Sequence, residues 1–137
     1  MFANTITFLL ATSAALLGAA AALPTAEADK ALSPRADGKF TWYYPGLGAC
    51  GQWNSENQLV AALNAADFDP YTPNGNPNRN SLCGRRIRAN YNGKSVEVTV
   101  VDRCPGCPRG GLDLSPAAFQ RLAHLNAGVI YGNWQWI

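Results

Sequence analysis

The chain has 137 residues, of which 47% are hydrophobic and 15% charged, and its formal net charge is +2. This length favours one domain. From residue 38 onward, nine Lys or Arg stand against six Asp or Glu, which excludes the strongly basic surface typical of nucleic-acid binding. No nucleic-acid partner is expected.

The N-terminal segment has the pattern of a signal peptide. Residues 6–23 carry no charged side chain, yet the run is too weakly apolar for a membrane span of about 20 strongly apolar residues. Residues 20–22 and 26–28 both have the pattern of two small residues around a central one that signal peptidase reads. We expect residues 1–22 to be a signal peptide, cleaved between 20 and 28, with a retained anchor as the alternative. Residues 23–38 are expected to be a disordered leader, and residues 39–137 an extracellular domain without membrane contact after cleavage.

All four cysteines lie in this domain, and an even number of cysteines in a secreted chain predicts disulfides. The segment Cys104-Pro-Gly-Cys107 suits a type II turn, whose end Cα atoms lie within about 7 Å of each other. A disulfide can bridge that span, so we expect the pairs Cys104–Cys107 and Cys50–Cys83. A thioredoxin-like redox motif and a four-cysteine zinc site are less favoured alternatives. No metal or other cofactor is expected.

Short strands separated by turn residues are predicted along the domain. Residues 40–43 are aromatic-rich and predict a strand, whereas the apolar run within 58–63 fits a strand or a helix equally well. Residues 67–81 contain three prolines and four asparagines, which predicts a long loop tied down by Cys83.

The second half of the domain gives the clearest local prediction. Asn92-Gly93 joins residues 84–91 to residues 94–102, with Val96, Val98 and Val100 sharing one face, which predicts a β-hairpin. Ser115 and Pro116 suit the N-cap and first position of a short helix that continues to Ala123. A final strand or strand pair is expected over 128–137. Many short strands with one or two short helices predict a mainly β fold, a small barrel.

Several motifs occur in an order that resembles a known family. They are Thr41-Trp42-Tyr43, Gly48-Ala49-Cys50-Gly51, Val100-Val101-Asp102 and Leu112-Asp113-Leu114-Ser115-Pro116. The order resembles the domain shared by expansins, rare-lipoprotein-A-like proteins, barwin and family 45 endoglucanases, and the cysteine pattern is most similar to that of loosenins. Secreted inhibitors of papain-like proteases are similar at this level. The resemblance implies a six-stranded, disulfide-stapled double-psi β-barrel.

The resemblance also implies a polysaccharide groove. Thr41 and Tyr43 match the start of the expansin groove, Asp113 matches its motif acid, and Asp102 matches a second carboxylate of bacterial expansin-like proteins. Exposed aromatic rings suit sugar stacking, and the candidates are Tyr44, Trp53, Trp134 and Trp136. The candidate substrate-binding residues are Thr41, Tyr43, Tyr44, Asp102, Asp113 and Trp134. The alternatives are that Asp113 accepts backbone N–H groups near the helix start and that Asp102 pairs with an arginine.

Glycoside hydrolysis normally needs two carboxyl groups. The family 45 enzymes take their base from an Asp near the first strand, where this chain has no carboxylate, so we expect no efficient hydrolysis. Asp113 is the only candidate acid for a weak glycan-directed activity. The sequence therefore favours a secreted, monomeric, non-hydrolytic wall-loosening protein that binds cellulose, chitin or another wall glycan. The alternative is an inhibitor of papain-like cysteine proteases that presents the rigid Cys104–Cys107 turn, or a defence or interaction protein.

Overall fold

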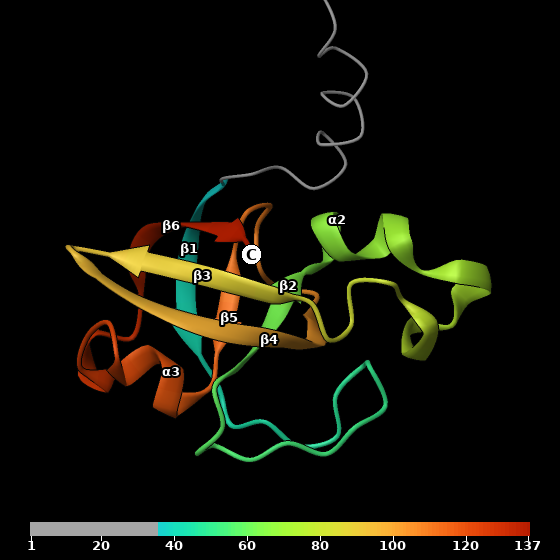
Figure 1. Ribbon diagram of the computed structural model, residues 1–137, viewed down its shortest axis with the longest axis horizontal. Coiled ribbons are helices and arrows are strands. Elements are labelled where there is room, and N and C mark those ends of the chain that lie inside the picture. The colour runs from blue at the N-terminus through green and yellow to red at the C-terminus, as the bar shows by residue number, and fades with distance from the viewer. Residues whose placement is uncertain (1–35) are drawn as a thin grey trace, which may run out of the picture. The chain divides into compact units, whose positions relative to one another are not determined.

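The structure is a computed structural model in which residues 36–137 are described (Figure 1). The predicted signal peptide and most of the predicted leader lie outside these residues. The first strand begins at Ala36, three residues before the predicted start of the domain.

Six strands form a closed barrel in the order β1-β5-β2-β4-β3-β6, with β6 pairing back to β1. They are β1 (Ala36–Trp42), β2 (Val60–Asn64), β3 (Arg86–Tyr91), β4 (Lys94–Cys104), β5 (Leu112–Leu114) and β6 (Ile130–Trp136). β1 runs parallel to β5 and β2 runs parallel to β4, while the other neighbours are antiparallel. The predicted mainly β, six-stranded barrel is confirmed.

Short helices connect the strands. They are α2 (Ala65–Phe68), α3 (Pro116–Gln120) and the 3-10 helices η1 (Asp69–Tyr71), η2 (Pro73–Gly75), η3 (Pro77–Arg79) and η4 (Leu125–Ala127). The prediction that residues 67–81 are one loop is therefore wrong. Its three prolines stand in the first turns of η1, η2 and η3, where the missing N–H and the fixed φ of proline fit. Between residues 36 and 137, every helix is too short or too polar to cross a membrane.

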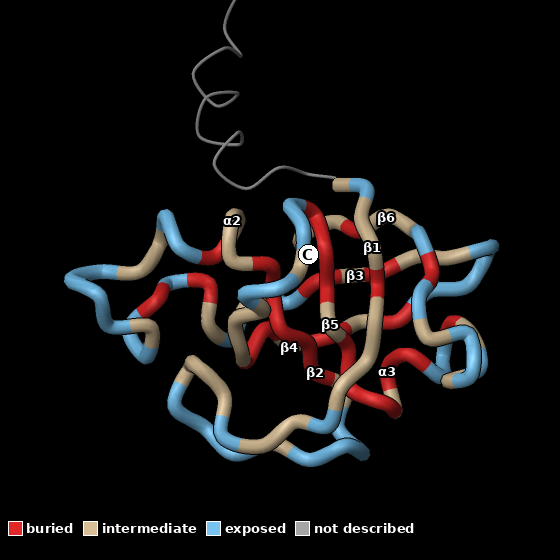
Figure 2. The backbone as a smooth tube through the Cα atoms, turned by 180° about the vertical axis from the view of Figure 1, so that it is seen from behind, coloured by how far each residue is buried: buried red, intermediate tan, exposed pale blue. Residues whose placement is uncertain are grey.

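Strand alternation divides an apolar interior from an outer face (Figure 2). Val96, Val98 and Val100 are all buried in the core, as predicted for one face of the hairpin. Residues 60–64, for which the sequence fitted a strand or a helix, form strand β2, and its Ala61 and Leu63 belong to the core. The turn of the hairpin has positive φ at Asn92 (49°) and Gly93 (82°), the backbone of the expected type I′ turn.

Two glycines allow the chain to cross itself inside the barrel. A Cβ atom at Gly38 would overlap the carbonyl oxygen of Gly110, and a Cβ atom at Gly110 would overlap the carbonyl oxygen of Asp37. The indole Nε1 of Trp134 donates a hydrogen bond to the same Gly110 oxygen at 2.8 Å. The segment before β5 is therefore pressed against β1 at a point where no side chain fits.

Both predicted disulfides are present. Cys50–Cys83 joins residues 33 apart in sequence with a Cα–Cα distance of 5.8 Å, and Cys104–Cys107 joins residues 3 apart with a Cα–Cα distance of 5.4 Å. All four cysteines are thus paired. In the chain-entropy account, the longer loop yields the greater stabilisation.

Replacing both cysteines of one pair by serine tests this difference. For Cys50 and Cys83 we expect a loss of about 3–4 kcal/mol in the free energy of unfolding, and for Cys104 and Cys107 about 2 kcal/mol. Urea denaturation followed by tryptophan fluorescence measures both losses. An equal or greater loss at the Cys104–Cys107 pair would contradict the loop-length explanation.

Candidate functional site

A row of register partners runs across four adjacent strands on the outside of the barrel. Thr41 of β1 is paired with Asp113 of β5, Asp113 is paired with Ala62 of β2, and Ala62 is paired with Asp102 of β4. Paired residues in neighbouring strands point to the same face. The two carboxylates therefore flank Ala62, which is itself buried.

A β-bulge turns Asp102 toward this outer face. The pairing of β2 with β4 jumps from Ala61↔Val100 to Ala62↔Asp102, so Val101 is the extra residue. Without the bulge, Asp102 would share the inward face of Val100, because side chains alternate with a period of two. A bulge re-aims a side chain in this way. Simple alternation along the sequence could not place Asp102 here.

Asp113 is a half-buried acid held by one hydroxyl. The Thr41 Oγ1 donates a hydrogen bond to its Oδ1 at 2.8 Å. Burial raises the pKa of Asp113, the Thr41 hydrogen bond opposes that shift, and the charge of Asp102 adds to it. The alternative role of Asp113 as acceptor for the helix start is not seen, because the side chain of Ser115 caps α3 by accepting from the Ala118 amide.

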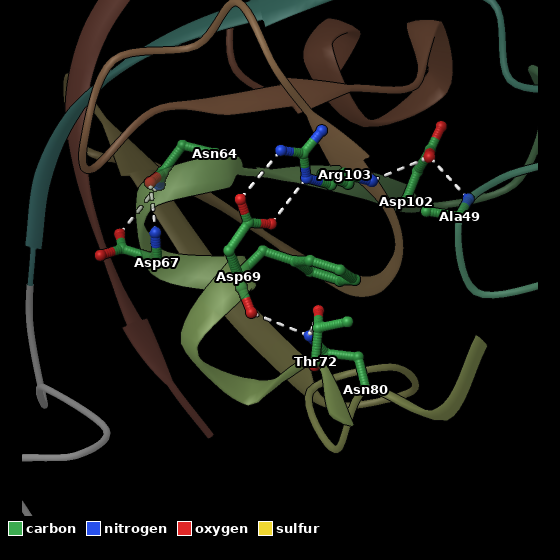
Figure 3. A network of polar contacts seen from close by, with 9 residues as sticks. Ala49, Asn64, Asp67, Asp69, Thr72, Asn80, Asp102 and Arg103 are labelled. Carbon is green, nitrogen blue, oxygen red and sulfur yellow. Dashed lines mark hydrogen bonds and ion pairs between the residues drawn. The ribbon is translucent and has the colours of Figure 1, made fainter. Parts of the chain in front are cut away.

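Asp102 is occupied by hydrogen-bond donors of the protein (Figure 3). Its Oδ1 accepts the backbone amides of Ala49 at 2.7 Å and Arg103 at 2.8 Å, and its Oδ2 accepts the Tyr43 hydroxyl at 3.3 Å. The expected alternative of an Asp102–arginine ion pair is wrong, since the Arg103 guanidinium instead holds Asp69 through two contacts of 2.6 and 2.8 Å. Asp102 thus anchors the segment around Ala49 to the barrel.

The hydroxyl group of Tyr43 lies in the electrostatic field of both carboxylates. Burial raises the pKa of its hydroxyl, and the negative charges of Asp102 and Asp113 raise it further. The phenol therefore stays protonated at any physiological pH. Tyr43 acts as a neutral hydrogen-bond donor beside the two acids.

A depression of about 250 Å³ opens beside Asp113. Its lining is Lys39, Thr41, Cys104, Gly106, Cys107, Pro108 and Asp113. A carboxylate oxygen of Asp113 and the sulfurs of Cys104 and Cys107 all lie within 4.8 Å of one another. Because both sulfurs are joined in the disulfide, they form a weakly polar wall next to the acid. Sequence reasoning had assigned neither Lys39 nor this disulfide to the site.

The aromatic candidates divide into exposed and buried residues. Tyr44 follows the row of polar residues and is 66% exposed, with its ring edge-on to Trp42. Trp53, on the same loop, is 76% exposed. The prediction of Trp134 as a sugar platform is wrong: it is 2% exposed, because closure of the barrel places its face of β6 inward.

The structure therefore brings together Thr41, Tyr43, Asp102 and Asp113, with Tyr44 at the edge. The double-psi β-barrel family model described as "Lytic transglycolase" matches residues 35–134. The chain belongs to this family.

A papain inhibitor from Streptomyces mobaraensis is 40% identical over 128 residues, which cover 90% of this chain and 87% of the relative. The solved Streptomyces papain inhibitor is similar in fold, with a TM-score of 0.69 and 38% identity over 77% of this chain and 96% of that one. The apo expansin of Clavibacter michiganensis has a TM-score of 0.63 and 25% identity over 75% of this chain and 50% of that one. The expected double-psi, expansin-like barrel is thereby confirmed.

Replacement of Asp113 by Asn tests the raised pKa. Ionising Asp113 costs more free energy in the folded than in the unfolded chain. The stability of the native protein therefore falls as the pH rises from the pKa of Asp113 in the unfolded chain, about 4, through its pKa in the folded chain. Asn keeps the acceptor for Thr41 without the charge. We expect Asp113→Asn to raise the melting temperature by a few degrees at pH 7 and to have no such effect below about pH 3.5, measured by calorimetry.

Asp69→Asn is the matched control, because the Arg103 hydrogen bond lowers the pKa of Asp69. The charged Asp69 carboxylate stabilises the folded protein above the pKa that Asp69 has in the unfolded chain, and this stabilisation is lost in acid. Asp69→Asn is therefore expected to be less stable than the parent at pH 7. A lowered melting temperature of Asp113→Asn at pH 7 would contradict the raised pKa of Asp113.

Proposed function

We propose that the chain is a secreted protein that binds a wall polysaccharide at the Asp113 depression without hydrolysing it. The observation that carries this proposal is the half-buried Asp113 carboxyl, held by Thr41 at the edge of a solvent-open depression. A carboxyl group in this setting accepts hydrogen bonds from sugar hydroxyls or donates one to them. These hydroxyls otherwise bond to neighbouring glycan chains, so binding to the carboxyl group loosens the packing of the chains. The two disulfides favour an oxidising, extracellular setting.

The arrangement of the second carboxylate argues against hydrolysis. Asp102 and Asp113 are separated by two inter-strand spacings, about 10 Å between Cα atoms, which by itself leaves room for a water between two acids. A base, however, must have an oxygen available for that water. Asp102 already accepts three hydrogen bonds from Tyr43, Ala49 and Arg103.

Binding is tested by pull-down on insoluble cellulose and chitin. We expect Asp113→Ala to weaken retention of the protein about 10-fold, because a hydrogen bond to a charged or strongly polar group contributes about 1.5–3 kcal/mol. Thr41→Ala removes the positioning hydroxyl and is expected to have a smaller effect. Glu56→Ala, an exposed acid outside the site, serves as the control and should bind as the parent does. Equal retention of the parent and Asp113→Ala would exclude the depression as the binding site.

Release of reducing ends from the same polysaccharides tests the absence of hydrolysis. The family description names a lytic chemistry, and a single protonated acid is the minimum that cleavage of a glycosidic bond requires. We expect no turnover above background for the parent protein between pH 4 and 7. Sustained release that disappears in Asp113→Ala would overturn the non-hydrolytic part of the proposal.

Inhibition of a papain-like cysteine protease is the second candidate function. It is favoured by the papain inhibitor that is 40% identical over 90% of this chain. Three exposed apolar side chains, Tyr44, Leu47 and Trp53, gather on one loop. The Leu47–Trp53 bridge and the Cys50–Cys83 disulfide constrain that loop, and a preorganised loop binds with a lower entropic cost. This loop is a better candidate than the Cys104–Cys107 turn because it carries three large exposed apolar side chains, whereas the turn between the cysteines holds only Pro105 and Gly106.

Papain inhibition at micromolar protein tests the second function. We expect Trp53→Ala to raise the inhibition constant at least about 10-fold, since buried tryptophans dominate binding energies at interfaces. Tyr131→Ala is the matched control, because Tyr131 is 72% exposed and lies on β6. If the parent protein leaves papain fully active, this candidate function is excluded. A parent that inhibits papain and a Trp53→Ala variant that inhibits equally would assign the inhibition to another surface.

A further inference from the structure

A second polar depression lies on the half of the barrel that does not carry Asp113. The row of Thr41, Asp113, Ala62 and Asp102 spans β1, β5, β2 and β4. The barrel closes through β3 and β6, and the outer surface of these two strands and the adjoining hairpin turn holds a depression of about 340 Å³. It is lined by Asn90, Tyr91, Asn92, Gly93, Lys94, Ser95, Tyr131, Gly132 and Asn133.

Register places two asparagines side by side on this outer face. Asn133 of β6 is paired with Asn90 of β3, and Asn90 is paired with Ser95 of β4. Their strand neighbours Ala89 and Trp134 are in the core, so the asparagine side chains point outward. Cross-strand alignment therefore produces a polar row of the same kind as the one at Asp113. The row continues to Asp37 of β1, which is paired with Asn133 but does not line the depression.

The two amides form a donor–acceptor pair. The Asn90 Nδ2 donates a hydrogen bond to the Asn133 Oδ1 at 3.1 Å, which fixes the orientation of both groups. Within residues 36–137, the Asn90 Oδ1 and the Asn133 Nδ2 are left for an external partner. One acceptor next to one donor matches two neighbouring hydroxyls of a sugar ring, since each hydroxyl both donates and accepts.

An exposed aromatic ring stands beside the amides. Tyr131 is 72% exposed and lies two residues from Asn133, on the same outer face of β6. An aromatic ring next to convergent polar groups is the usual composition of a small-molecule site. No acidic residue lines the depression and Lys94 is its only charged residue, so an uncharged ligand fits better than a strongly charged one.

We propose that this face is a second, weaker binding site for a neutral glycan chain, with Asn90 and Asn133 holding a pair of ring hydroxyls and Tyr131 stacking on a sugar ring. The inference rests on the proposed function for the class of ligand but uses none of the same residues. The two sites adjoin across β1 and β6, because Lys39, which lines the first depression, is paired with Tyr131, which lines the second. A protein with both sites holds two neighbouring glycan chains at once. Binding at one site then raises the effective concentration at the other when both chains belong to the same fibre.

The test is an NMR titration of the ¹⁵N-labelled protein with soluble six-unit oligosaccharides of β-1,4-linked glucose and of β-1,4-linked N-acetylglucosamine. For at least one oligosaccharide, we expect chemical-shift changes in two separate sets of signals, one around Asp113 and one including the side-chain amides of Asn90 and Asn133. The Asn133→Ala, Tyr131→Ala double variant should lose the second set and keep the first. Val129→Ala, an exposed apolar residue just before β6, is the control and should keep both sets.

The outcomes separate this inference from the proposed function. Loss of the Asp113 set in Asp113→Ala, with the Asn90 and Asn133 set intact, supports two independent sites. Changes confined to the Asp113 region would overturn the second site and leave the proposed function standing. Changes confined to the Asn90 and Asn133 region would support the second site and contradict the proposed one. If neither oligosaccharide shifts any signal at millimolar concentration, both are excluded for these glycans.

Discussion

The arrangement of the site depends on the backbone contact between Gly38 and Gly110. At both positions, a Cβ atom would overlap a carbonyl oxygen of the other segment. Thr41 stands three residues after Gly38 and Asp113 three residues after Gly110, so the parallel register of β1 with β5 carries this contact forward to the Thr41–Asp113 pair. Trp134 completes the crossing by donating its indole N–H to Gly110. A tryptophan that resembles a sugar platform in the sequence is thus part of the support for the acid.

The two aspartates have different roles in the structure because their surroundings differ. Asp113 meets one hydroxyl and a disulfide and stands in a depression, where poor solvation favours its protonated form. Asp102 receives two backbone amides and a phenol, and it ties the loop around Ala49 to β4. One carboxyl group therefore faces the open depression and the other fixes the local backbone. The same anchoring constrains the loop that carries Trp53, so the two proposed functions depend on the same part of the barrel.

Local features of the fold were well predicted from sequence, whereas side-chain directions depend on closure of the barrel. Asn92-Gly93, the cysteine spacing and Ser115-Pro116 determine structure over a few residues, and the turn, the disulfide and the helix N-cap are confirmed. The helix itself ends at Gln120 and not at Ala123 as predicted. The resemblance to expansins placed Asp102 and Asp113 on one face, but the bulge at Val101 that makes this possible leaves no signal in the alternation. The direction of Trp134 and the pairing of Asn90 with Asn133 follow from which strands meet across the barrel, which the sequence of either strand does not encode alone.

Closure of the six strands has a further consequence for association between protein molecules. Each strand between residues 36 and 137 has a partner on both sides, so the barrel offers no open row of backbone N–H and C=O groups to a foreign strand. Open edges of that kind are templates for self-association. Closure therefore protects the barrel from strand-to-strand association, and contacts with other molecules are left to side chains and loops.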